Sequence, residues 1–129
     1  MVRPLSQRAL APPVLAAAAA LAVAGCGRDE EPARARAGVV EMRLTDYRMD
    51  PQAVQGRRGR LEFRVRNDGR VPHNLQIRGP AGVVRLQIST MLPGESSTAE
   101  VRLGRGPWTM FCAIGNHEEL GLHGALELR

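Results

Sequence analysis

Residues 61–66 read LEFRVR, an alternation of apolar and charged side chains with a period of two. Successive side chains along a β-strand point to opposite faces, so this pattern predicts a strand with one buried face and one solvent-facing side. The turn-forming run Asn67-Asp68-Gly69 follows directly and predicts where the strand ends. This stretch therefore indicates a β-sheet fold rather than a helical one.

The same alternation recurs through the rest of the chain from Val39 onward, and no segment keeps a helical period for three turns. Turn signals rich in glycine and proline separate the apolar runs, at residues 67–69, 79–82, 92–94 and 104–107. Seven or so short strands within residues 39–129 predict a single all-β domain, an antiparallel β-sandwich or barrel.

The first 25 residues differ in composition from the rest. Arg3 and Arg8 precede an apolar run from Ala9 to Gly25 that is mostly alanine and leucine, and Cys26 follows small residues. This order resembles a bacterial lipoprotein signal peptide, residues 1–25, with Cys26 lipidated as the first mature residue. The run is shorter than the ~20 residues of a spanning helix, although an uncleaved anchor or an ordinary signal peptide stays open. We expect an extracytoplasmic protein anchored to a bacterial membrane by its lipid.

Residues 26–38 are polar beyond Cys26 and lack an apolar period, which predicts a flexible tether between the lipid and the domain at 39–129. The chain has 18 basic and 13 acidic residues, for a formal net charge of +5. These charges are scattered singly along the predicted strands. Because nucleic-acid binding needs a concentrated basic face, we expect no nucleic-acid partner.

Cys112 is the other cysteine of the chain. If Cys26 carries a lipid, Cys112 is unpaired outside the cytoplasm and needs another explanation. His117 follows five residues later in a loop that contains Gly115, and His73 opens another predicted strand after the 67–72 turn. A thiolate with two imidazoles suits copper in both of its oxidation states. An inert buried thiol and a nucleophilic Cys–His pair are the alternatives, the second without an evident oxyanion site.

Three motifs in this order resemble the cupredoxin family of small blue-copper proteins: VPHN at 71–74, LPGE at 92–95, and Cys112-x4-His117-x4-Leu122. The resemblance covers Val39 to Arg129 and implies a Greek-key β-sandwich of about seven or eight strands. It implies one copper ion per chain, with His73, Cys112 and His117 as equatorial ligands. It also implies that Asn74 hydrogen-bonds toward the cysteine loop.

Leu122 stands where most cupredoxins carry the axial methionine. Leucine has no donor atom, so the resemblance implies a non-coordinating axial position and a raised reduction potential. Multicopper oxidases share the cysteine-x4-histidine-x4-leucine spacing. Their trinuclear cluster, however, needs more than the three histidines of this chain, so we expect no enzyme. His123 directly follows Leu122 and is expected at the surface.

The resemblance thus implies a monomeric carrier of single electrons whose protein redox partner is unknown. Residues 118–120 would lie at the rim where that partner docks. Two alternatives stay open: a module for copper storage, delivery or sensing, and a copper-free cupredoxin-like interaction domain.

Overall fold

Ten β-strands and no helix make up the part of the chain that this computed structural model describes, residues 30–129. The predicted signal peptide and Cys26 lie outside the described residues. In residues 30–129, no helix has the length and apolar character needed to cross a membrane. The strands are β1 Ala33–Arg34, β2 Val39–Thr45, β3 Arg48–Asp50, β4 Ala53–Gly56, β5 Gly59–Asn67, β6 His73–Arg78, β7 Val84–Met91, β8 Ser96–Leu103, β9 Gly106–Phe111 and β10 His123–Leu128.

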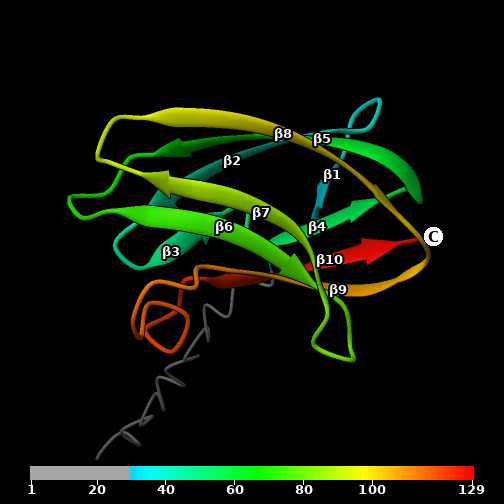
Figure 1. The fold of residues 1–129 in the computed structure, drawn as a ribbon. Helices are drawn as coiled ribbons and strands as arrows, with labels where there is room; N and C mark the ends of the chain where they lie inside the picture. The colour runs from blue at the N-terminus through cyan, green and yellow to red at the C-terminus, as the bar shows by residue number, and fades with distance from the viewer. Residues whose placement is uncertain (1–29) are drawn as a thin grey trace, which may run out of the picture.

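Two sheets face each other as the layers of a sandwich (Figure 1). One has six strands in the order β1-β4-β10-β9-β6-β7, and the other has four in the order β3-β2-β5-β8. Along β5, Leu61, Phe63 and Val65 are buried between the layers, whereas Arg64 and Arg66 face solvent. The predicted all-β sandwich is confirmed, and its core consists of the inward-facing residues that the period-two pattern identifies.

The sheets are mixed in direction, which departs from the expected antiparallel arrangement of seven or eight strands. β2 runs parallel to β5, and β4 runs parallel to both β1 and β10. Alternation shows which side of a strand is buried, but it does not encode the direction of the neighbouring strand. The extra strands are β1, β3 and β4, which have two to four residues each and are too short to show a period of their own.

The domain begins earlier than the expected boundary at Val39. β1 pairs with β4, with Ala33 opposite Val54, and the Ala35 N–H donates to the Gln55 carbonyl at 2.9 Å. Further back, Glu30 forms a 2.8 Å ion pair with Arg48 at the start of β3. The described part of the predicted flexible tether is therefore docked on the domain. Its backbone supplies partners for the β4 edge, which would otherwise carry unpaired N–H and C=O groups.

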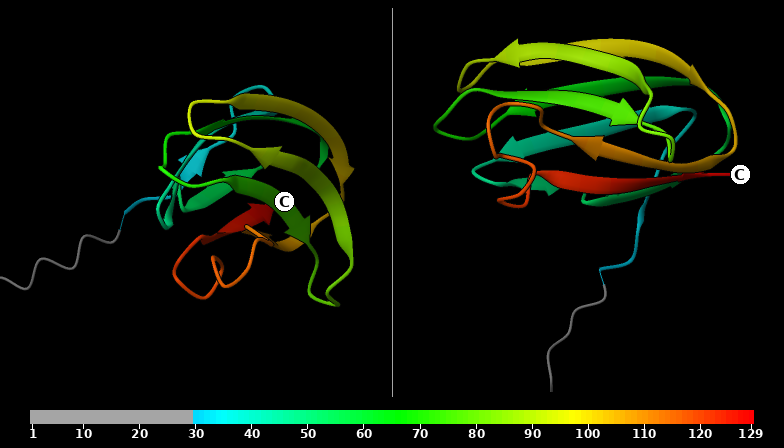
Figure 2. Two further views of the ribbon diagram at one scale, coloured as in Figure 1. Left: turned by 60° about the vertical axis from the view of Figure 1, so that its left-hand side comes forward. Right: turned by 60° about the horizontal axis from the view of Figure 1, so that its bottom comes forward.

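The buried side chain of Asn67 organises the end of the sandwich where β5 leads into β6. Its amide nitrogen donates to the carbonyls of Val71 and Met91, both at 2.9 Å, and its Oδ1 accepts from the Gly69 N–H. The Asn67 carbonyl accepts a further bond from Gly94. These bonds fix the β5–β6 turn, residues 68–72, against the β7–β8 turn. His73 thereby begins β6 at a defined position, and Figure 2 shows this end of the molecule from two further sides.

Candidate metal centre

Two histidines and a cysteine from different segments meet at one end of the sandwich. His73 is the first residue of β6, Cys112 directly follows β9, and His117 lies in the β9–β10 loop, residues 112–122. Their ligand atoms all lie within 4.8 Å of one another. The two histidine Nδ1 atoms are 3.3 Å apart, and Cys112 Sγ is 3.6 Å from His117 Nδ1. This group of three side chains can hold one metal ion.

The environments of the three side chains differ. His73 and Cys112 are fully buried, and Cys112 is a free thiol. His117 is only partly buried. A metal held here would be shielded from water on two sides and connected to the surface through one imidazole.

Hydrogen bonds along the β9–β10 loop keep Cys112 and His117 close together. The Cys112 N–H donates to the Leu122 carbonyl at 3.0 Å, and the Leu122 N–H donates to the His117 carbonyl at 2.9 Å. Gly121 has φ +123°, a conformation that L side chains rarely adopt. A Cβ at Gly121 would also lie only 2.8 Å from the Tyr47 carbonyl oxygen. The loop therefore closes tightly and packs against the β2–β3 turn.

Asn74 connects β6 to the same loop. Its backbone N–H points to Cys112 Sγ at 3.5 Å, and its side-chain Oδ1 accepts a 2.8 Å bond from the Ala113 N–H. The second bond links the Asn74 side chain to the loop that follows Cys112. Together the two bonds set the distance between the His73 segment and the cysteine and give the sulfur a hydrogen-bond donor.

Asp46 and Tyr47, in the turn between β2 and β3, are neighbours of the site that the sequence analysis did not identify. Asp46 Oδ1 lies 2.8 Å from His73 Nε2, and Oδ2 accepts a 2.8 Å bond from the Arg70 N–H. The Arg70 bond, followed by that of His73, lowers the pKa of Asp46 below its usual value, although burial opposes the shift. The Tyr47 ring meets the His117 ring edge-on at a centroid distance of 4.9 Å.

Glu118, in the segment 118–120, is held by an ion pair with Arg78. Both guanidinium nitrogens of Arg78 reach its carboxylate, one of them at 3.0 Å. This bond lowers the pKa of Glu118 against the effect of burial. The Arg78 guanidinium also lies 4.1 Å from the centroid of the Phe111 ring. One side chain of β6 thus contacts the residue before Cys112 and the residue after His117.

The other residues that the sequence analysis singled out are Leu122, His123 and Leu120. Leu122 is fully buried at the end of the loop, and its backbone bonds to both Cys112 and His117. His123 is exposed at the start of β10, where it pairs with Phe111, and lies outside the metal-binding group of three. Leu120 is exposed to solvent, half of its surface being accessible.

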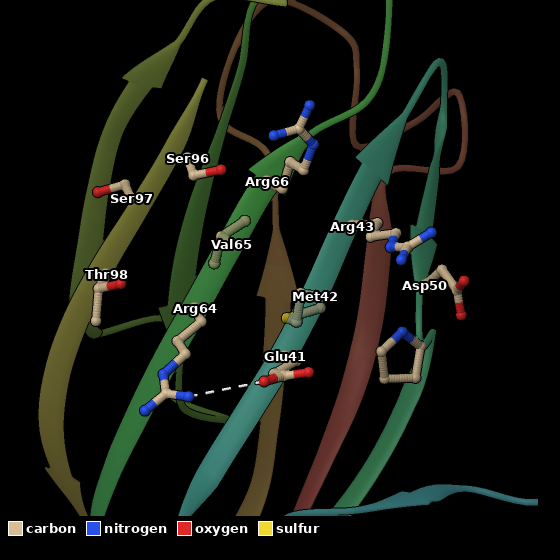
Figure 3. Close-up of a pocket in the computed structure, with 11 residues that line it drawn as sticks. Glu41, Met42, Arg43, Asp50, Arg64, Val65, Arg66, Ser96, Ser97 and Thr98 are labelled. Atoms are coloured by element: carbon tan, nitrogen blue, oxygen red, sulfur yellow. Dashed lines mark ion pairs between the residues drawn. The ribbon is translucent and has the colours of Figure 1, made fainter. Parts of the chain in front are cut away.

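A hollow of about 460 Å³ on the four-stranded sheet is separate from this site. Figure 3 shows its lining, in which charged side chains of β2 and β5 stand beside Ser96, Ser97 and Thr98. Arg64 pairs there with Glu41 at 3.7 Å and with Glu62 at 2.5 Å. None of the three candidate metal ligands lines this hollow. Its lining carries three arginines and two acidic residues, so charges of both signs are interspersed there.

No protein-family model matches the chain, and no curated protein matches it by sequence. Solved structures do match. Dithionite-reduced auracyanin from Roseiflexus castenholzii aligns with a TM-score of 0.65 and 16% identity, over 71% of this chain and 97% of that one. A purple cupredoxin from Nitrosopumilus maritimus aligns with a TM-score of 0.55 and 18% identity, over 70% and 99%. A multicopper oxidase aligns with a TM-score of 0.56 and 18% identity, over 70% of this chain but 41% of its own.

At these identities the likeness establishes the fold. The described part of the chain has the cupredoxin fold, as the sequence motifs indicated, and a cysteine and two histidines meet at one end of it.

Proposed function

We propose that this chain is a blue-copper protein that carries single electrons outside the cytoplasm, tethered to a membrane through a lipid on Cys26. The observation that carries the proposal is the meeting of His73, Cys112 and His117 within 4.8 Å at one end of a cupredoxin fold. The similarity of the fold to a reduced auracyanin and to a purple cupredoxin supports the same class. The anchor rests on the sequence pattern of residues 1–26.

The donor set fits copper. A thiolate favours Cu(I), and imidazoles are acceptable to both oxidation states. Both imidazoles turn Nδ1 toward the partner ligands, and the Asn74 N–H supports the sulfur. A bound copper ion would supply reversible one-electron exchange between Cu(II) and Cu(I).

The protein would restrain the positions of the three ligands and would provide one path for electron transfer to the surface. The bonds among Cys112, His117 and Leu122, with the bond from Ala113 to Asn74, restrain the loop in either oxidation state. His117 is the partly exposed ligand, so its imidazole offers the short path to a docked partner. Leu122 would fill the axial side without a donor atom, which supports a raised reduction potential.

Titration of the chain from residue 27 onward with Cu(II) tests the proposal. We expect one copper per chain by metal analysis and an intense visible absorption band from the thiolate–copper bond. Cys112→Ser should abolish the band. His123→Ala, which changes a histidine outside the group of three, should keep it. A wild-type chain that stays colourless with Cu(II) would overturn the proposal.

The similarity to a multicopper oxidase suggests an alternative, that the chain is an oxidase, and the histidine count argues against it. The whole chain has three histidines, and two of them belong to the site described above. A trinuclear copper cluster cannot be assembled from what is left. We therefore infer that the chain transfers electrons without catalysing a reaction of its own.

A further inference from the structure

The two nitrogens of the His73 ring face different partners. Nδ1 is turned toward His117 Nδ1 at 3.3 Å, within the metal-binding group, and Nε2 is turned toward Asp46 Oδ1 at 2.8 Å. A neutral imidazole carries one proton, and it binds a metal through the nitrogen that is not protonated. To bind a metal through Nδ1, His73 must keep its proton on Nε2, where Asp46 accepts it.

The Asp46 carboxylate is itself held in place. Its other oxygen accepts a 2.8 Å bond from the Arg70 N–H, so the β2–β3 turn is fastened to the β5–β6 turn. Gly69 lets the two turns close on each other, because a Cβ there would collide with Asp46 Oδ1 and lie 2.7 Å from His73 Nε2. His73 is fully buried and the Asp46 side chain is 24% exposed, so Nε2 is shielded from bulk water whereas the carboxylate is partly solvated.

We propose that Asp46 is a positioning residue that selects the metal-binding tautomer of His73 and favours the oxidised ion through its negative charge. This role of Asp46 rests on the copper-binding function proposed above, and it adds a residue that would control the reduction potential. A carboxylate that accepts the outer N–H of a ligating histidine makes that ligand more basic. This effect lowers the reduction potential and opposes the rise expected from an apolar Leu122.

The tautomer can be measured without copper. In the ¹⁵N-labelled, metal-free chain from residue 27 onward, long-range ¹H–¹⁵N NMR spectra should show His73 protonated on Nε2. In Asp46→Asn, which keeps the shape and removes the charge, we expect this single tautomer to be lost. Asp68→Asn is the matched control, because Asp68 lies in the β5–β6 turn that Asp46 contacts but pairs with Arg66 at 2.6 Å. A wild-type His73 protonated on Nδ1 would overturn the proposal with no variant needed.

Metal binding gives the second measurement. Loss of such an outer partner typically weakens metal affinity about 10- to 100-fold, and we expect a loss of this size for Zn(II) and Cu(II) in Asp46→Asn. The reduction potential should rise in Asp46→Asn and stay unchanged in Asp68→Asn. If affinity, potential and tautomer are all unaltered in a folded Asp46→Asn chain, Asp46 has no positioning role. Because the tautomer readout uses no metal, it can fail or succeed independently of the copper proposal.

Discussion

Leu122 is the residue beside the candidate ligands through which the proposed reduction potential can be tested. It is fully buried, and its backbone bonds to Cys112 and His117. A thioether at this position would add a weak donor that stabilises Cu(II) more than Cu(I). We therefore predict that Leu122→Met lowers the reduction potential of the copper-loaded chain, measured by redox titration of the visible band.

Leu120→Met is the control for that substitution, because Leu120 lies in the same loop with its side chain exposed. It should leave the potential unchanged. A potential that is the same in Leu122→Met and wild type would mean that Leu122 does not occupy the axial position.

Gly121 serves the site through its backbone. Gly121→Ala meets two penalties, a φ of +123° and a Tyr47 carbonyl oxygen only 2.8 Å from the added Cβ. Gly59 has a similar φ of +129° but nothing within 4 Å of an added Cβ. We predict that each alanine lowers the free energy of unfolding by about 1–3 kcal/mol through backbone strain, and that Gly121→Ala loses more. Urea denaturation measures the unfolding free energy of both variants. Equal losses would show that the loop can shift away from the Tyr47 carbonyl at little energetic cost.

At the level of residues, the sequence was sufficient to identify the three side chains that meet at the candidate metal centre, but not the residues that hold them in place. Cys112 and His117 are five positions apart in one loop, and the VPHN motif drew attention to His73 and Asn74. No motif or spacing in the sequence indicated Asp46. It lies 27 residues before His73, and the two meet only because the β2–β3 turn folds onto the β5–β6 turn.

Among the elements, the β9–β10 loop depends on β6 through the contacts of Arg78 with Glu118 and Phe111. Arg78→Lys keeps the charge but loses the forked geometry and most of the stacking on the ring. Both partners of the ion pair are about one-third exposed, so we predict a loss of at most about 1 kcal/mol in unfolding free energy. Hydrogen exchange should become faster at the amides of residues 113–121.

Arg60→Lys is the matched control for this prediction. Arg60 pairs with Glu100 on the exposed face of the four-stranded sheet, away from the loop. It should leave hydrogen exchange in residues 113–121 unchanged. Equal exchange in wild type and Arg78→Lys would show that the hydrogen bonds of the loop restrain it without the arginine.

The long strands were predictable, and the short ones were not. β2, β5 and β7 have seven to nine residues, enough for the apolar period to appear in the sequence. β1 has two residues, neither of them buried, and its pairing depends on the exposed edge of β4 rather than on any pattern of its own. The parallel pairs are set by how the chain crosses between sheets, which side-chain periodicity does not report.

At the scale of the whole molecule, the proposed lipid on Cys26 decides where the protein works. We predict that Cys26→Ser moves the full-length chain from the membrane fraction to the soluble fraction of the producing bacterium. Mass spectrometry of the wild-type chain should find acyl groups on Cys26 as the first residue. A Cys26→Ser chain that stays in the membrane would instead indicate an uncleaved anchor in residues 1–25.

The docking of residues 30–36 on the sheet edge limits how far the domain can move from such a lipid. Glu30 is paired with Arg48, and Ala33–Arg34 form β1. Only four peptide steps separate Cys26 from Glu30. A fully extended chain gains about 3.5 Å per step, so the lipid attachment lies within roughly 14 Å of Glu30. A carrier held this closely by the proposed lipid would search for its partners by diffusing in two dimensions along the membrane. We therefore propose that it would exchange electrons with proteins of the same membrane surface.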